Sequence, residues 1–433
     1  MSAGTRRAAR LVTAAVAAFG LVVGSASVAQ AAEPGTNWWY DAFGVPEAQA
    51  AGWTGAGVKI AVIDGQINTE LPVFAGTHLT VDKDPLCEGG SVTTTAPNPS
   101  NEVAHGSNVT ALLVGNGTGK GQVRGIAPDA DVTFYGYGYD GDSGPGTACI
   151  LDTLPDGLTV FGEGIERAVA DGARVISISQ GTSNTTEGDA AVIADALAKG
   201  VVIVAATPNS MNDDELKWLW SFNGVVAVNA FDKDGNLQPD QEVSGQKVAW
   251  PETTVVAPGV GLPSVDWGST EHVVSGSSFA TPLTAGVLAL TMQKYPGATG
   301  NQVVQSLIHN TTPDDHALSR DDTVGYGPVS LRHLLRVDPS QYPDENPLLD
   351  KASGVPSAEQ VAKAGAASSP STSPSASAAA PLPDHADDSG SGVPTWVWLV
   401  AGAGVLVVLA VIAIVIIVVV SGRRKNRNVG GSL

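Results

Sequence analysis

The sequence predicts an α/β domain in which a mostly parallel sheet carries helices on both faces. The short apolar runs lack the alternation of apolar and polar residues that is typical of a sheet with one face exposed to solvent. We therefore expect strands that are buried on both faces. These runs lie at residues 58–63, 173–179, 201–206, 224–228 and 253–258. Helical patterns at 164–172 and 189–200 separate several of them. In such a fold, reactive groups belong at the carboxyl ends of the strands.

The first 31 residues have the pattern of a secretory signal peptide. Arg6, Arg7 and Arg10 precede a long apolar stretch, and the small-residue motif AQA ends at Ala31. This order of charge, apolar core and small residues is typical of a cleaved signal. We therefore expect the exported chain to begin near residue 32.

The opposite end of the chain predicts a membrane anchor. Residues 396–420 are uncharged, apolar and long enough to cross a bilayer as one helix. The basic run RRKNR at 423–427 places the tail, residues 421–433, in the cytoplasm and everything before residue 396 outside. Residues 351–395 are rich in Ser, Ala and Pro, which is typical of a flexible stalk. The expected domain is thus residues 32–350 of a single-pass protein of the cell membrane.

Charge and cysteine content narrow the classes of function. The formal net charge of −20 disfavours nucleic acid as a partner. Cys87 and Cys149 are the only cysteines in the sequence, and in an exported domain one structural disulfide between them is the leading interpretation. So few soft ligands argue against a metal site, and we expect no cofactor.

The stretch VVSGSSFATPLTAGVLAL at 273–290 passes from an apolar strand into an apolar helix through the turn Ser-Gly-Ser-Ser at 275–278. One interpretation is a tight turn, in which Gly276 permits an unusual backbone and Ser277 or Ser278 caps the helix. The other is that Ser278 is a nucleophile at a helix N-terminus, where amides and the helix dipole favour developing negative charge. The second interpretation requires a base and a carboxylate elsewhere in the chain.

Two residues meet that requirement. Asp64 ends the apolar run VKIAVID, although by itself it is better interpreted as a turn aspartate. His105 opens HGSNVTALLVG, whose apolar spacing indicates a helix that starts at the histidine. A serine hydroxyl needs a base to take its proton, and the imidazole needs a carboxylate to fix its tautomer. Asp, His and Ser follow one another here in the chain order of subtilisin.

Several segments resemble, in the same order, the sequence blocks of the subtilisin-like serine protease family. They are VKIAVIDG, HGSNVTALLVG, GIAPDADV, ARVISISQG, GVVIVAATPNS, VVAPG and SGSSFATPLTAGVLAL, and together they cover about residues 36–340. The signal, a cysteine on each side of the histidine block, the stalk and the single terminal span are similar to those of the mycosins. These are membrane-anchored proteases associated with type VII secretion in actinobacteria.

The resemblance implies a role for each matching residue. Asp64 orients the imidazole, His105 is general base and acid, and Ser278 is the nucleophile. Asn209 stands where the family keeps its oxyanion-hole asparagine, with the backbone amide of Ser278 as the second donor. The segment SQG, which is Ser179, Gln180 and Gly181, corresponds to the strand that pairs with an extended substrate and lines the pocket beside the scissile bond.

The chain departs from the family at Gly65, Ser107 and Ser277, where the family usually has threonine, and at Pro208, where it has glycine. Proline fixes φ and removes an amide donor, and this affects the direction in which the neighbouring Asn209 side chain points. The predicted function is a membrane-anchored, extracytoplasmic serine endopeptidase with polypeptide substrates and a link to type VII secretion components. The alternative is a catalytically silent subtilase fold that serves as a structural component of a secretion complex. A stalked adhesion module would not explain the four residues in register.

Overall fold

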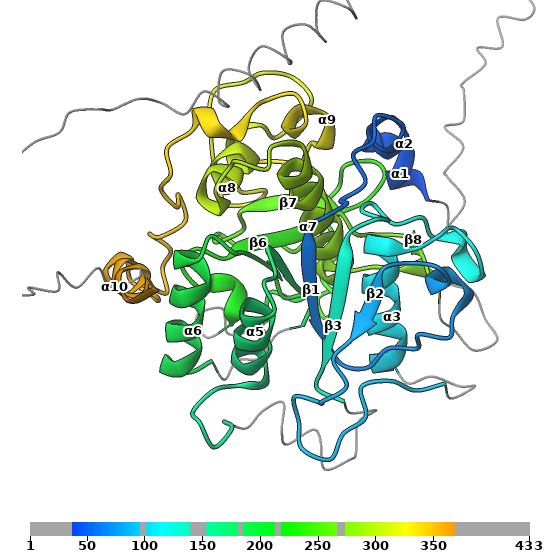
Figure 1. Cartoon of the computed structure of the whole chain (residues 1–433). Helices are drawn as coiled ribbons and strands as arrows, with labels where there is room; N and C mark the ends of the chain where they lie inside the picture. Colours follow the sequence, from blue (N-terminus) through cyan, green and yellow to red (C-terminus); the bar gives the residue numbers. More distant parts are fainter. Residues whose placement is uncertain are drawn as a thin grey trace, which may run out of the picture. The chain divides into compact units, whose positions relative to one another are not determined.

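The computed structural model describes residues 37–95, 101–138, 153–180, 185–212, 218–265 and 273–368. Its centre is a seven-stranded parallel sheet with the strand order β2-β3-β1-β4-β5-β6-β7 (Figure 1). The strands are β1 (Lys59–Asp64), β2 (Leu79–Val81), β3 (Asp131–Gly136), β4 (Val175–Ile178), β5 (Val202–Ala206), β6 (Val226–Phe231) and β7 (Val255–Pro258). A two-stranded antiparallel sheet pairs β8 (Leu262–Pro263) with β9 (Val273–Val274). The parallel α/β class predicted from the sequence is confirmed.

Helices cover both faces of the sheet. The helices α3 (Asn101–Val114), α7 (Ser277–Lys294) and α8 (Gly300–His309) belong to one layer, and α5 (Val160–Ala170) and α6 (Glu187–Ala198) to the other. The core divides accordingly, because Val202 and Val204 of β5 join the cluster of α3 and α7, whereas Ile203 and Ala205 join that of α5 and α6. A strand that buries both faces needs apolar side chains throughout, which is why its run is continuous.

Smaller elements complete the domain. They are α1 (Trp38–Ala42), α2 (Val45–Ala50), α9 (Leu331–Leu334) and the 3-10 turns η1 (Pro72–Phe74), η2 (Lys120–Gln122), η4 (Leu219–Ser221) and η5 (Pro339–Gln341). The N-terminal segment is held to the body by side chains. Gln293 of α7 accepts from the amides of Thr54 and Gly55 at 2.8 Å each, and Arg332 of α9 donates to the carbonyl oxygen of Ala42 at 3.1 Å.

The folded part continues past residue 350, where the sequence analysis placed the start of the stalk. Residues 346–357 form a strap that is hydrogen-bonded to residues 220–225, and α10 (Ala358–Ser368) then packs against α6 (Figure 1). The amide of Gly224 donates to Leu348 O and the amide of Asn223 to Val355 O, both at 2.7 Å. Composition alone misses this segment because its anchors are backbone groups and one buried lysine, not an apolar run.

Several expectations concern residues outside those that the structure describes. They are the signal peptide at 1–31, the stalk from residue 369, the span at 396–420 and the tail at 421–433. Among the described residues, no helix is both long and apolar enough to cross a membrane.

Candidate active site

Adjacent strand ends bring together the residues singled out in the sequence. Asp64 is the last residue of β1, Ser179 follows β4 directly, and Asn209 lies three residues beyond β5. The strands β1, β4 and β5 are neighbours in the sheet, so their carboxyl ends lie side by side. The expectation that the reactive groups gather at one edge of a parallel sheet is met by this topology.

Asp64 and His105 form a buried hydrogen-bonded pair. The His105 Nδ1 and Asp64 Oδ1 atoms are 3.0 Å apart, and the Gly65 amide donates to the same oxygen at 2.8 Å. Asp64 is fully buried, whereas the His105 side chain is 19% exposed. The expected helix start at His105 is wrong, because α3 begins at Asn101 and the histidine lies in its second turn. The polar residues at 101 and 102 hid this first turn from an apolar-spacing argument.

The surroundings of His105 favour its protonated form. Burial alone would lower the pKa of this imidazole, but the charge and hydrogen bond of Asp64, together with the charge of Glu102, raise it above its ordinary value. The Phe279 ring packs against the imidazole with centroids 5.6 Å apart. The Gln180 side-chain amide also reaches the ring, with Nε2 3.1 Å from Nδ1. Since Nδ1 gives its single hydrogen to the Asp64 carboxylate and the Gln180 Nε2 atom is itself a donor, the two nitrogens form no hydrogen bond and the contact is one of packing.

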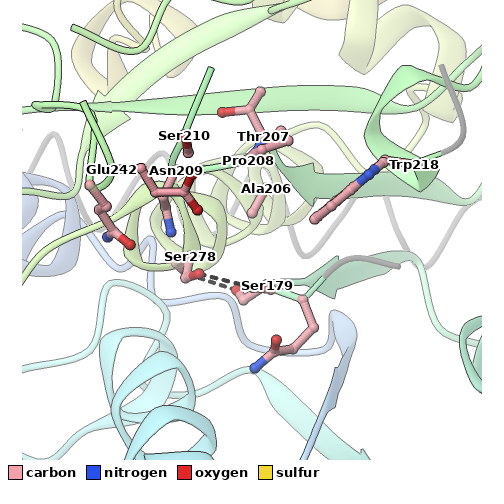
Figure 2. Close-up of a pocket in the computed structure, with 11 residues that line it drawn as sticks. Ser179, Ala206, Thr207, Pro208, Asn209, Ser210, Trp218, Glu242 and Ser278 are labelled. Atoms are coloured by element: carbon pink, nitrogen blue, oxygen red, sulfur yellow. Dashed lines mark hydrogen bonds between the residues drawn. The ribbon is translucent and has the colours of Figure 1, made fainter. Parts of the chain in front are cut away.

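Ser278 is the second residue of α7. Its hydroxyl donates to the carbonyl oxygen of Ser179 at 2.9 Å, and the Ser179 hydroxyl donates back to the Ser278 carbonyl oxygen at 2.7 Å (Figure 2). The two bonds tie the end of β4 to the start of α7. In the described part of the chain, the Ser278 hydroxyl is therefore directed to a backbone carbonyl and not to His105.

Asn209 is held through its side-chain oxygen. Oδ1 accepts from the Ser277 amide at 3.1 Å and from the Ser277 hydroxyl at 3.0 Å. The amide nitrogen is thereby turned to the opposite side, toward Ser278 (Figure 2). Pro208 does not prevent this arrangement, and its own carbonyl oxygen accepts from the Trp250 indole at 3.2 Å. Although Pro208 has no amide hydrogen, the side-chain nitrogen of Asn209 still points toward Ser278.

Gly276 makes room for Asn209. Its φ of +150° lies in a region that side-chain-bearing residues rarely adopt, and a Cβ there would stand 3.2 Å from Asn209 Nδ2. The predicted turn is therefore present, with Gly276 at the N-cap position of α7. The serine expected to cap this helix does not do so through its side chain. The Ser277 hydroxyl instead donates to Thr207 O and to Asn209.

A pocket of about 270 Å³ opens beside Ser278 (Figure 2). It is lined by Ser179, Gln180, Ala206, Thr207, Pro208, Asn209, Ser210, Trp218, Gln241, Glu242 and Ser278. Two residues expected to contact substrate, Ser179 and Gln180, thus line it, and the third, Gly181, lies outside the described residues. The indole of Trp218 gives one wall an apolar aromatic surface.

Cys87 is fully buried and disulfide-bonded. Cys149 lies outside the described residues, so its pairing with Cys87 stays a prediction.

Two residues near His105 escaped the sequence analysis. Glu102 stands one helical turn before the histidine, and Tyr137 follows β3 and donates to Glu102 Oε2 at 2.8 Å. The spacing of three residues between Glu102 and His105 on one helix was a usable signal, because such residues share a face. The contribution of Tyr137 comes from a distant strand and had no local signal.

Comparison with known proteins identifies the family of the chain. The model of the subtilase family, peptidase S8, matches residues 55–327. The chain belongs to the subtilase family. Alkaline elastase YaB of Bacillus sp. (strain YaB) is 28% identical over 275 residues, which are 64% of this chain and 65% of the elastase. The chain thus spans just under two thirds of the elastase. Subtilisin Savinase of Lederbergia lenta is 28% identical over 301 residues, 69% of this chain and 98% of the relative.

Solved structures place a mycosin among the subtilases that share this fold. MycP1 from Mycobacterium smegmatis superimposes with a TM-score of 0.53 at 21% identity, covering 71% of this chain and 86% of MycP1. At this identity the likeness concerns the fold. The predicted resemblance to subtilisin-like proteases, with mycosins among the neighbours, is confirmed.

Proposed function

We propose that this subtilase is a membrane-anchored, extracytoplasmic serine endopeptidase. The observation that carries the proposal is the buried Asp64–His105 pair, with Nδ1 and Oδ1 3.0 Å apart, at the sheet edge where Ser278 and the Asn209 amide meet beside a pocket. A nucleophile, a base, an orienting carboxylate and an oxyanion donor are the groups that peptide hydrolysis by acyl transfer requires.

In the proposed reaction the Ser278 hydroxyl leaves the Ser179 carbonyl oxygen by a rotation of its side chain and donates to His105 Nε2. Oγ attacks the scissile carbonyl as the imidazole takes its proton. The buried Asp64 carboxylate keeps the hydrogen on Nδ1 and stabilises the imidazolium that forms. The imidazolium then protonates the leaving amine, and water releases the acyl group by the same steps in reverse.

The oxyanion would be held by two donors. Among the described residues nothing accepts from the Asn209 amide nitrogen, and its oxygen is held by Ser277, so the nitrogen can donate to an oxyanion. The Ser278 amide is at the second position of α7, and the first four amides of a helix have no partner within it. Both donors are fixed before substrate arrives, so they stabilise the developing charge without reorganisation.

The substrate class that fits is an extended polypeptide. Residues 179 and 180 leave the sheet beside β5 and line the pocket, where a peptide can add as a further strand. The side chain before the scissile bond would enter the pocket and lie against Trp218.

The setting outside the membrane rests on sequence patterns. A signal at 1–31 and an apolar span at 396–420 followed by basic residues support export and anchoring. A neighbour in fold is MycP1 from the ESX-1 type VII secretion system, which supports a proposed link of this chain to such a system.

A fluorophosphonate probe tests the activity directly. The full-length wild type should become covalently labelled and should hydrolyse an unfolded protein, whereas Ser278→Ala should do neither while keeping its melting temperature within a few degrees. Ser210→Ala, a change of another serine at the pocket wall, is the matched control and should still be labelled.

A second candidate function is a silent structural subunit, favoured by the Ser278 hydroxyl being bonded to Ser179 O. A folded wild type that neither labels nor cleaves, yet binds secretion components, would establish that candidate.

A further inference from the structure

We propose that Glu102 is a positioning residue for His105. Its carboxylate acts on the imidazole together with that of Asp64, lies in the space left by Gly65 and accepts a hydrogen bond from Tyr137. This inference rests on the proposed function, because the imidazolium matters only if His105 is the base. No feature of the sequence blocks that resemble the family assigns Glu102 a role.

Helix geometry places Glu102 on the side of α3 that carries His105. The two residues are three apart, which puts their side chains on one face of the helix one above the other. Glu102 is half-buried. Its carboxylate therefore lies in a region shielded in part from water, where a charge acts over a longer range than on the surface.

Gly65 leaves the space that the Glu102 carboxylate fills. A Cβ at residue 65 would stand 2.7 Å from Glu102 Oε2 and 3.1 Å from Glu102 Cβ. Both distances are shorter than ordinary contacts, so any side chain there must push the carboxylate aside. Gly65 is also the residue next to Asp64, so the Glu102 carboxylate of α3 lies beside the end of β1 that carries Asp64.

Tyr137 fixes the direction of the carboxylate. Its hydroxyl donates to Glu102 Oε2 at 2.8 Å, and its side chain is almost wholly buried. Burial, together with the charges of Asp64 and Glu102, raises the pKa of Tyr137 well above its ordinary value. The phenol consequently stays protonated and keeps donating throughout the pH range in which His105 titrates.

The groups around the imidazole have one sign of charge. Asp64 faces it from β1 and Glu102 from α3, while Gln180 after β4 and Phe279 of α7 are uncharged. No cation stands among these described neighbours. Two negative charges and no positive one favour the imidazolium, and the pKa of His105 is raised by both carboxylates.

The departure at Gly65 is thereby explained. Where the family usually has a threonine, this chain has no side chain, and a glutamate from the helix occupies the space. The two positions form a coupled pair, and the expected functional result is a base that becomes protonated at a higher pH than Asp64 alone would set.

Direct titration of His105 tests the inference without requiring activity. The full-length chain, labelled with 15N at histidine, is titrated by NMR, and the His105 signal is identified by its loss in His105→Gln. Glu102→Gln should lower the His105 pKa by about one unit. Glu359→Gln, which removes an equal charge from the exposed face of α10, should leave it unchanged. A shift below about 0.2 unit in Glu102→Gln would overturn the proposal.

Gly65→Ala supplies a second, independent perturbation. It should displace the carboxylate and lower the His105 pKa in the same direction as Glu102→Gln. In the Glu102→Gln background it should add little further shift, since there is no charge left to displace. Equal shifts in both backgrounds would show that Gly65→Ala acts through Asp64 and would contradict the coupling.

Kinetics then separate this inference from the proposed function. If the wild type hydrolyses peptides, the acid limb of its kcat/KM profile should move to lower pH in Glu102→Gln, with KM nearly unchanged. A wild type with no hydrolysis but a shifted His105 titration would refute the endopeptidase and leave the electrostatic pairing established.

Discussion

The hydroxyl of Ser278 and the carbonyl oxygen of Ser179 are joined by a 2.9 Å hydrogen bond. This bond directs the proposed nucleophile to a backbone carbonyl and not to His105. A substrate strand that adds beside residue 179 brings a backbone N–H that competes for the same carbonyl oxygen. Binding of the correct backbone would therefore itself release the hydroxyl for attack.

Substrates altered in the backbone test this release. Methylation of the amide nitrogen of the residue that enters the pocket removes the competing donor, and kcat/KM should fall by about tenfold, the equivalent of one hydrogen bond. Methylation one residue further toward the N-terminus, where the strand's N–H points the other way, is the control and should cost less. Equal losses for the two peptides, measured by initial rates, would argue against pairing at Ser179.

Asn209→Ala should lower kcat by about a hundred- to a thousandfold with little change in KM, because the lost donor acts mainly in the transition state. Steady-state kinetics with a fluorogenic peptide measure both constants. A loss of about twofold or less in kcat would mean that the Asn209 nitrogen does not face the oxyanion, against the expected magnitude.

Gly276→Ala should reduce both stability and activity. The new Cβ must adopt a φ near +150° and press on Asn209 Nδ2, which stands 3.2 Å away. Gly261→Ala is a matched control, since Gly261 also has a positive φ, of +70°, but open space around its Cβ position. Thermal unfolding should show destabilisation in both variants, whereas the loss of kcat should be confined to Gly276→Ala.

The pH dependence of the reaction follows from the raised pKa of His105. The base must be neutral to accept the serine proton, so the acid limb of kcat/KM should have its midpoint above the ordinary histidine value of about 6.5. The same shift contributes stability that is present below that value and lost as pH rises through the folded-state pKa. Chemical unfolding of the wild type and of His105→Gln from pH 5 to 9 measures this difference.

Lys351→Met should destabilise the domain, and more so at high pH. The Lys351 ammonium nitrogen donates to Trp220 O at 2.8 Å and to Val225 O at 2.7 Å, and burial lowers the pKa of this lysine to about 7. A neutral amine still has two hydrogens for the two acceptors. Loss of both should cost about 2–6 kcal/mol, at 1–3 kcal/mol for each buried acceptor left unpaired.

The sign of the pH effect at Lys351 is opposite to that at His105. Between pH of about 7 and the ordinary lysine value of about 10.4, the unfolded chain binds a proton that the folded chain does not. Wild-type stability should therefore rise with pH in this window relative to Lys351→Met, by at most about 1.4 kcal/mol per pH unit. Denaturant unfolding at pH 7, 8 and 9 would show no such divergence if the lysine stays charged.

Much of the fold was predictable because buried parallel strands appear in the sequence as unbroken apolar runs. The runs that end at Asp64 and before Asn209 became β1 and β5, and the sheet topology then brought both residues to one edge. The strands β2 and β3 escaped prediction. Polar residues such as Thr80, Asp131 and Thr133 interrupt them, because β2 is an edge strand and its neighbour is partly solvated.

Which residues form the site was easier to predict than how their side chains are arranged. The doubt raised by Pro208 concerned the backbone, but the aim of Asn209 is set by Ser277, a residue 68 positions away. Likewise Gly65 could be read as a departure from the family, yet its meaning depends on where the Glu102 side chain lies. Such contacts depend on tertiary packing, which no local pattern of residues specifies.

The strap at residues 346–357 has a mechanical consequence for a domain proposed to be tethered at its C-terminus. A pull on that end loads α10 first, which is short and rich in alanine and can peel from α6 one turn at a time. The load then reaches the hydrogen bonds of the strap, which end on residues 220–225, close behind Trp218 in the pocket wall. Tension in the proposed tether would thus reach the residues that follow Trp218 only after α10 has detached from α6.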